Sequence, residues 1–352
     1  MPYNTDHPFG GFSNEVLEAI IKDELATRLQ MSRFYDTDFS LTTADGLIKT
    51  IHRYHLAEGS EVQELERAAK NDKFINAAFD TYKYEAKRFQ GTISYADDDL
   101  YKDSAYVAAL IKYLGQSWEN SMTTRAVNEF AKTENVIGLS DSLNLGDFAD
   151  MLNQYTKVYE NTEGLFWLAS QDLEATIIKS LGSELMYIED FIRVGSRGAV
   201  LGQPLFFSKA LPSKTLFLAT RDAVKCYVKA DVNVESTRDI EAKTNTSVIS
   251  SYAVISLVDD TKCIQGGKEM AVPVTITTAT KNTSVIAGAA TTGARVVAYG
   301  KDGTILGAAT ASGNEYEITM TEGTLAAGDE IKVIADGIPG YIKSIYRFTV
   351  AE

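Results

Sequence analysis

The segment "AVKCYVKADVNVESTRDIEAKTNTSVISSYAVISLVDDTKCI" (Ala223–Ile264) contains two β-like runs separated by a charged, Thr/Ser-rich interval. Val, Ile, Tyr and Thr are the residues that favour strands, and we expect strands near Ala223–Val234 and Ser250–Ile264. The segment has no histidine and no glycine, so it supplies neither an imidazole nor a phosphate-binding loop. The strongest strand signal therefore lies where no catalytic motif does.

A long helix is the clearest helical signal in the chain. The segment Asp97–Lys132 places a set of apolar side chains on one stripe of a helix, namely Val107, Ile111, Leu114, Trp118, Met122, Ala126 and Phe130. Asp97–Asp99 put negative charge at its N-terminus, where the helix dipole favours it. At 1.5 Å per residue such a helix would span ~50 Å, which is typical of a spine rather than of a surface helix.

The N-terminal third predicts an arm followed by an extended excursion. Leu17, Ile21, Leu25 and Leu29 recur every four residues and predict a helix between Asn14 and Arg33. Gly46–Gly59 and Thr81–Ala96 read as strands, and Val62–Phe79 between them is charged and partly helical in composition. Because an isolated pair of strands is marginal in water, this excursion needs a partner.

Two further regions follow from composition. Val136–Asp222 alternates helical segments with short apolar runs, a pattern that indicates a compact α/β unit. After the boundary at Gln265–Pro273 the chain is rich in Val, Thr, Ile, Ala and Gly, with a hairpin signal at Asp302–Gly303. This last region predicts a small antiparallel sandwich of about 80 residues.

The totals limit the classes of function. The chain has 352 residues, 45% of them hydrophobic, and a formal net charge of −14. That length suits two or three domains, and the negative charge argues against a protein whose main task is to grip nucleic acid. No apolar run approaches the ~20 residues that span a bilayer, and the first residues lack the pattern of a secretory signal.

The search for a reaction centre gives no residue set, so we expect no enzyme, no cofactor and no metal. His52 and His55 have a spacing that places them on opposite faces of a strand, with no third ligand nearby. Cys226 and Cys263 read as small buried hydrophobes, with a disulfide as the minority interpretation. The motifs of α/β-hydrolases and P-loop proteins are absent from the sequence.

The order of these segments, together with "VKADVNVESTRD" (Val228–Asp239) and "YAVISLVDDTK" (Tyr252–Lys262), resembles the major capsid proteins of tailed bacteriophages. This Hong Kong coliphage-type fold is shared with encapsulins, and the resemblance covers roughly Ser13–Ile264. It implies an α+β fold. The C-terminal segment, with Thr291–Met320 and Leu325–Gly337, separately resembles a bacterial immunoglobulin-like repeat, which implies an all-β sandwich. The implied parts are an N-terminal arm (1–42), an extended loop (43–96), a peripheral domain with the spine helix (97–135 and 223–266), an axial domain (136–222) and an immunoglobulin-like surface domain (270–352).

The resemblance also implies a function. The chain would be a coat subunit that assembles into hexamers and pentamers of an icosahedral shell around double-stranded DNA, located in the virion capsid and assembled in the bacterial cytoplasm. Its partners would be copies of itself, portal, scaffolding and decoration proteins, and DNA contacted non-specifically, with no membrane and with weak carbohydrate or cell-surface contact by the sandwich. Charged residues expected at contacts between subunits are Arg53, Lys87, Arg88, Arg238 and Asp239.

Three alternatives remain open at this point. An encapsulin-type compartment would share the fold and package an enzyme. An immunoglobulin-bearing surface protein would require export. An enzyme has no residue set behind it.

Overall fold

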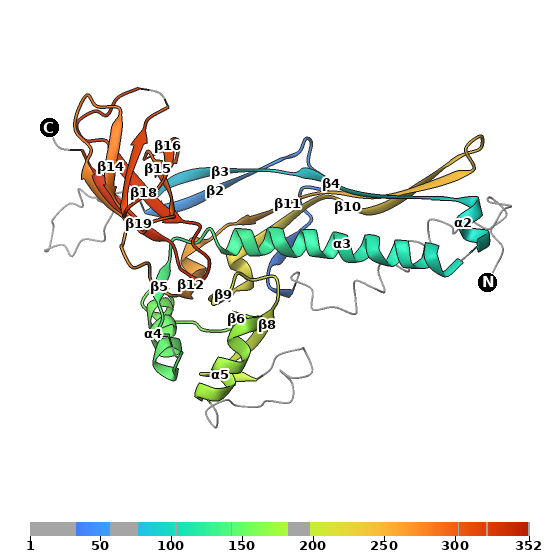
Figure 1. Ribbon diagram of the computed structural model, residues 1–352, viewed down its shortest axis with the longest axis horizontal. Helices are drawn as coiled ribbons and strands as arrows, with labels where there is room; N and C mark the ends of the chain where they lie inside the picture. The colour runs from blue at the N-terminus through green and yellow to red at the C-terminus, as the bar shows by residue number, and fades with distance from the viewer. Residues whose placement is uncertain are drawn as a thin grey trace, which may run out of the picture. The chain divides into compact units, whose positions relative to one another are not determined.

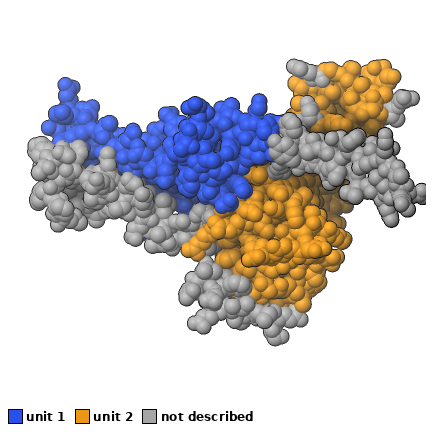
Figure 2. All heavy atoms as spheres, turned by 180° about the vertical axis from the view of Figure 1, so that it is seen from behind, with its two compact units in different colours: residues 1–32, 36–121, 225–256 blue, residues 33–35, 122–224, 257–352 orange. Residues whose placement is uncertain are grey.

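The computed structural model describes residues 33–56, 77–102, 104–141, 143–181, 198–301, 303–321 and 323–350. The expected N-terminal helix, most of Val62–Phe79 and an expected strand at Met186–Ser196 lie outside these ranges. Figure 2 shows the two compact units into which the chain divides. Of the described residues, unit 1 contains those within 36–121 and 225–256. Unit 2 contains those within 33–35, 122–224 and 257–352.

Unit 1 is built on a four-stranded sheet with the order β1-β10-β11-β4. Its strands are β1 (Asp36–Asp38), β10 (Val224–Asp239), β11 (Thr244–Leu257) and β4 (Lys87–Ala96). The Thr/Ser-rich interval, expected as a separator, is instead mostly strand: β10 and β11 meet at a short turn in which Asp239 accepts hydrogen bonds from the backbone N–H groups of Glu241 and Ala242. Thr, Ser and Val all fit a half-buried pleated surface, which explains the greater length of both strands.

The spine helix divides into α2 (Asp97–Lys102) and α3 (Ser104–Phe130). The 27 residues of α3 correspond to ~40 Å. Residues 104–121 of this helix belong to unit 1, where Figure 1 shows α3 running beside the long strands. Leu114 and Trp118 are buried on its sheet-facing side. The Trp118 ring meets Phe89 of β4 edge-on at 6.3 Å, and Gly91 leaves the space that the Leu114 side chain occupies.

The excursion is a two-stranded antiparallel sheet of β2 (Ile48–Leu56) and β3 (Ala77–Glu85). Its register runs from Ile48 opposite Glu85 to Leu56 opposite Ala77. The expected pairing is therefore confirmed for this hairpin. The expectation that the excursion continues through residue 96 is wrong, because β4 pairs along its length with β11 of the four-stranded sheet.

Unit 2 contains a six-stranded mixed sheet with the order β5-β12-β9-β6-β8-β7. Its elements are β5 (Val136–Gly138), β6 (Leu165–Ser170), β7 (Ala199–Val200), β8 (Gln203–Ser208), β9 (Leu216–Thr220) and β12 (Cys263–Gly267), with helices α4 (Leu145–Thr156) and α5 (Glu174–Leu181) and the 3-10 turns η2 (Gln171–Leu173), η4 (Arg221–Ala223) and η5 (Asp260–Lys262). The α/β unit expected from the sequence is thus confirmed.

One boundary differs from the expectation. The run Ser250–Ile264 was expected to be a single strand, but it breaks at η5, and β12 joins β9 and β5 in the other sheet. Asp259 accepts a hydrogen bond from the backbone N–H of Thr261, and short polar side chains that bond their own backbone favour turns over strands. Ile264 therefore lies in the core of unit 2.

The central strand β6 is buried at all six positions because both faces of the sheet are covered. Trp167 on one face meets Phe148 of α4 edge-on at 4.9 Å. Phe166, on the other face, packs against Phe34 at 5.0 Å and Phe130 at 6.4 Å. Successive side chains of a strand point to opposite faces, so this Phe-Trp pair joins two packing layers.

The C-terminal region of unit 2 is a β-sandwich, as the composition predicted. One sheet has the order β13-β14-β17 and the other β16-β15-β18-β19, and the strand pairs within both sheets are antiparallel. The strands are β13 (Thr275–Thr278), β14 (Val285–Ala289), β15 (Arg295–Tyr299), β16 (Ile305–Thr310), β17 (Glu315–Thr319), β18 (Glu330–Asp336) and β19 (Ser344–Thr349). The sandwich has its own apolar core, which shares no residue with the core of the six-stranded sheet.

Candidate functional site

The β2–β3 hairpin is fixed to its unit at its base. Lys49 lies opposite Tyr84 and Ile51 opposite Tyr82 in the register, so these four residues share one face. Tyr84 is buried and stacks on Tyr227 of β10 with ring centroids 5.4 Å apart, and the Lys49 Nζ lies 5.9 Å from the centre of the Tyr227 ring. Tyr82, two residues further out, is 38% exposed. Contacts beyond this base are required to hold a lone pair of strands in water.

The opposite face of the hairpin carries His52. Its Nδ1 lies 3.0 Å from the hydroxyl oxygen of Thr81, directly across the register. The His55 side chain lies outside the description. Within the described ranges, no group of three or more His, Cys, Asp or Glu side chains is placed to hold a metal ion.

Two residues expected at subunit contacts lie next to each other on β4. Lys87 and Arg88 are exposed and pair in register with Ala253 and Tyr252 of β11. Arg53 lies on β2 opposite Asp80 by its backbone, and its side chain is outside the description. Their role between subunits stays a prediction.

The other two expected contact residues, Arg238 and Asp239, have partners inside unit 1, and their role between subunits also stays a prediction. Arg238 donates to Asp97 Oδ2 at 2.6 Å, and both side chains are largely buried. Asn245 donates to the other oxygen of Asp97 at 2.8 Å. Asp239 accepts from the β10–β11 turn. These contacts tie the end of the long hairpin to the start of α2, a structural task that the sequence did not indicate.

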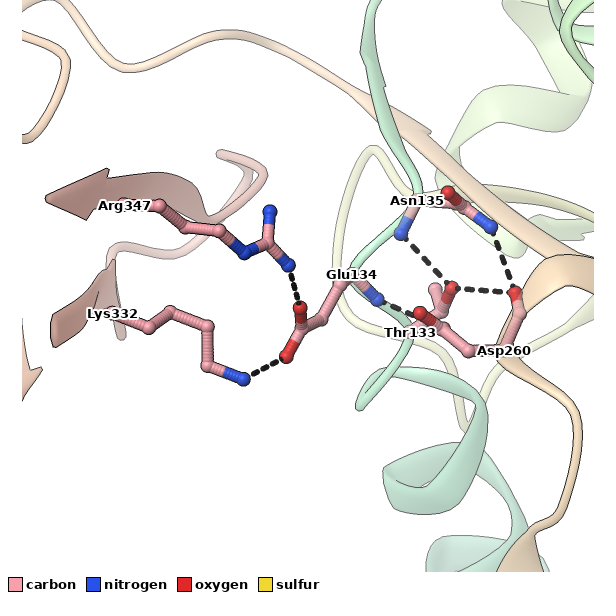
Figure 3. Close-up of polar contacts among 6 residues, drawn as sticks. All are labelled: Thr133, Glu134, Asn135, Asp260, Lys332 and Arg347. Atoms are coloured by element: carbon pink, nitrogen blue, oxygen red, sulfur yellow. Dashed lines mark hydrogen bonds and ion pairs between the residues drawn. The ribbon is translucent and has the colours of Figure 1, made fainter. Parts of the chain in front are cut away.

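A polar network follows the end of α3 in unit 2 (Figure 3). The backbone N–H of Glu134 donates to Asp260 Oδ1 at 2.9 Å, and the Asn135 side chain donates to the Asp260 carbonyl at 2.8 Å. The Thr133 hydroxyl donates to the Cys263 carbonyl at 2.8 Å and is fully buried. The peptide of Glu134 is therefore held from both sides, so its side chain projects from a fixed point.

The Glu134 carboxylate accepts from two cations of the sandwich (Figure 3). Lys332 of β18 bonds one oxygen, and Arg347 Nη2 of β19 bonds the other at 2.6 Å. Lys332 and Arg347 are directly opposite each other in the register. Sequence reasoning missed this cluster, because its members are separated by 198 and 213 residues and outward-facing Lys and Arg on strands are common.

Further contacts join the sandwich to the rest of unit 2. Lys343 Nζ donates to the Ala131 carbonyl at 3.0 Å, just after the last turn of α3. Burial lowers the pKa of the Lys343 ammonium, while Asp260 and Glu134 act in the opposite direction. The backbone N–H of Ile342 donates to the Lys268 carbonyl at 2.9 Å. A groove of about 860 Å³ opens beside these contacts and is lined by Lys343, Tyr299 and residues of the α3 end.

The two cysteines are buried and free, as the main interpretation of the sequence had it. Burial raises the pKa of the Cys226 thiol to about 11 and raises that of Cys263 still further. Reactive thiols have lowered pKa values and some exposure, so neither residue has the properties of a nucleophile. Within the described part of the chain, no helix is both long and apolar enough to cross a membrane.

Comparison with known proteins gives different results for the sequence and for the fold of the chain. No protein-family model matches the chain, and no curated protein matches it by sequence. Solved structures do match it. The capsid of Ralstonia phage GP4 aligns at 10% identity with a TM-score of 0.52, over 66% of this chain and 86% of that one.

Two other structures resemble the chain to a similar degree. The mature capsid of bacteriophage PhiM1 aligns at 8% identity with a TM-score of 0.51, covering 76% of this chain and 90% of that one. A virus-like particle from Pyrococcus furiosus aligns at 11% identity with a TM-score of 0.51, covering 71% and 97%. The chain therefore has the tailed-phage capsid fold, joined to a C-terminal β-sandwich.

Proposed function

We propose that the chain is the major capsid protein of a tailed bacteriophage and that it acts by assembling rather than by catalysing a reaction. Copies would form hexamers and pentamers of an icosahedral shell around double-stranded DNA, assembled in the host cytoplasm. Portal, scaffolding and decoration proteins would be its other partners. The observation that carries the proposal is the fold, which is that of phage capsid subunits at nearly their full length.

The β2–β3 hairpin supports the assembly part of the proposal. It is a sheet of two strands only, with an aromatic anchor at its base. Two strands bury too little surface to be stable alone, so a neighbouring copy is a suitable partner for the part of the hairpin beyond this anchor. The exposed Lys87 and Arg88 on the next strand are candidates for charge contacts between copies, each contributing about 0.2–1 kcal/mol if solvated.

The test is the assembly state of the purified full-length chain. Sedimentation velocity combined with negative-stain imaging should show large closed particles or sheets of hexamers in equilibrium with smaller oligomers. A monodisperse monomer across a range of salt, pH and protein concentration would contradict the proposal.

A compartment that packages a protein cargo is the second candidate, because the chain resembles a virus-like particle from Pyrococcus furiosus to the same degree as it resembles phage capsids. The contents of purified particles discriminate the two. Packaged genomic DNA in particles from infected cells supports the phage capsid, whereas one co-purifying enzyme at fixed stoichiometry supports the compartment.

For the sandwich we propose an immunoglobulin-like module on the outer surface of the shell that makes weak contacts with carbohydrate or cell surfaces. Its support is the set of seven short antiparallel strands in sheets of three and four. The fourth strand, β16, pairs with β15 and not with β17, which differs from the constant-type immunoglobulin arrangement. Antibody against the sandwich should decorate intact particles; decoration only after disruption would contradict the outward placement.

A further inference from the structure

The sandwich meets the core of unit 2 through polar contacts rather than through a shared apolar core. The two apolar cores have no residue in common, and a groove of about 860 Å³ lies beside the contact. A junction that is packed like a protein interior resists rotation. Here Ile342 packs on Gly267 and Lys343 bonds the Ala131 carbonyl, and the two ion pairs of Glu134 hold the sandwich at a further point.

Glu134 has a special place among these contacts. Lys332 and Arg347 are cross-strand neighbours, and like charges directly opposite each other destabilise a sheet. Both cations bond the same carboxylate, which belongs to the loop after α3. When the sandwich contacts Glu134, the carboxylate offsets the repulsion between Lys332 and Arg347. When the sandwich leaves Glu134, that repulsion returns.

The two sides of this contact differ in how they are held. The Glu134 backbone is fixed by Asp260, whereas the Arg347 side chain is 68% exposed. Lys332 also lies 5.5 Å from the centre of the Tyr299 ring, which gives it a second favourable contact when Glu134 is lost. The sandwich thus keeps its own fold while its link to the core is exposed to solvent ions.

We propose that Glu134 is an electrostatic latch that holds the C-terminal sandwich in one orientation, and that high ionic strength or loss of its charge releases the sandwich without unfolding it. Salt acts because the Debye length falls from about 10 Å at 0.1 M to about 3 Å at 1 M. Released, the sandwich stays linked through the chain around Gly267 and Lys268, where Ile342 packs on Gly267. This inference rests on contacts within one chain and does not depend on shell assembly.

The test measures the orientation directly. Nitroxide labels on Ala175→Cys and Thr324→Cys, both exposed positions, report the distance from α5 to the sandwich by pulsed electron resonance. The native thiols are buried and need not be removed. Labelled chain is diluted into excess unlabelled chain, so that only distances within a subunit are recorded.

The latch predicts one narrow distance distribution for the parent chain at low salt and a broader one near 1 M salt. Glu134→Gln should give the broad distribution at both salt levels. Glu330→Gln is the matched control, because Glu330 forms an exposed ion pair with Lys301 on the same sandwich, and it should behave like the parent chain.

A variant with the charges exchanged distinguishes loss of the ion pairs from misfolding. Glu134→Arg combined with Lys332→Glu and Arg347→Glu should restore the narrow distribution and its salt dependence. A narrow, salt-independent distribution for Glu134→Gln would overturn the latch. A charge-exchanged variant that is folded by circular dichroism and still gives a broad distance distribution would also overturn it.

Discussion

The contact between α3 and the sheet of unit 1 yields a quantitative prediction at Gly91. A Cβ atom built at this position would lie 2.7 Å from Leu114 Cδ1 and 3.2 Å from Ile249 Cγ2. Forcing a methyl group into a packed core costs about 1–3 kcal/mol. Gly91→Ala should therefore destabilise unit 1 by that amount, although alanine favours a strand more than glycine does.

The cause of this cost can be isolated with a double-mutant cycle. Leu114→Ala alone should cost about 2–5 kcal/mol, because it removes a buried side chain and leaves a cavity. In that background the added methyl meets no Cδ1 atom and keeps only its 3.2 Å approach to Ile249 Cγ2, so Gly91→Ala should cost less than in the parent and the two changes should couple by at least about 1 kcal/mol. Thr92→Ala, at the exposed neighbouring position of β4, is the control and should stay within about 0.5 kcal/mol of the parent.

Urea unfolding of unassembled chain, read by hydrogen exchange of peptides from α3 and β11, gives these free energies. Additive effects of the two substitutions would refute the packing that places Leu114 over Gly91.

Three further predictions test other parts of the molecule. Burial raises the pKa of Tyr316 to about 12, so the unfolded chain loses this proton at lower pH than the folded chain does. The sandwich should therefore lose stability as pH rises from about 10 to 12. In thermal unfolding, Tyr316→Phe should flatten this pH dependence, whereas Tyr341→Phe should not. Trp167→Phe removes the indole donor to a buried backbone carbonyl and should cost about 1–3 kcal/mol in urea unfolding, and a change below 0.5 kcal/mol would contradict that contact. Tyr84→Ala removes the aromatic contact with Tyr227 and should speed hydrogen exchange in β2 and β3 of the unassembled chain. Slow exchange of these strands in the parent monomer would contradict the need for a partner.

Much of the fold could be predicted from local patterns. The apolar stripe through Leu114 and Trp118 identified α3, and the composition after Pro273 identified the sandwich. Helices α4 and α5 and strands β6, β8 and β9 fall where apolar runs and turn residues indicated them. These signals depend on periods of 3.6 and 2 residues, which a single sequence displays directly.

The partner of each strand could not be predicted in the same way. The residues of β4 alternate like those of the hairpin before them, yet β4 pairs with β11, about 150 residues away. Cys263 and Ile264 follow the strand-like run that ends at Val258 after only four polar residues, yet the turn at Asp259 sends them to another sheet. Alternation specifies a half-buried strand, but the neighbouring strand is chosen by long-range packing.

The candidate contact residues show the same limit. Arg238 bonds Asp97 within its own unit, a contact that the sequence did not indicate, and its expected role between subunits stays a prediction. Glu134 was not singled out in the sequence, and its carboxylate joins two parts of unit 2. A charge is visible in a sequence, whereas its partner depends on the folded chain.

Cryo-electron microscopy of particles formed by this chain would show whether a second subunit completes the hairpin. We expect closed shells in which each β2–β3 hairpin lies against a neighbouring subunit. Particles whose subunits leave the hairpin without a neighbour, or a chain that stays monomeric under every assembly condition, would contradict this expectation.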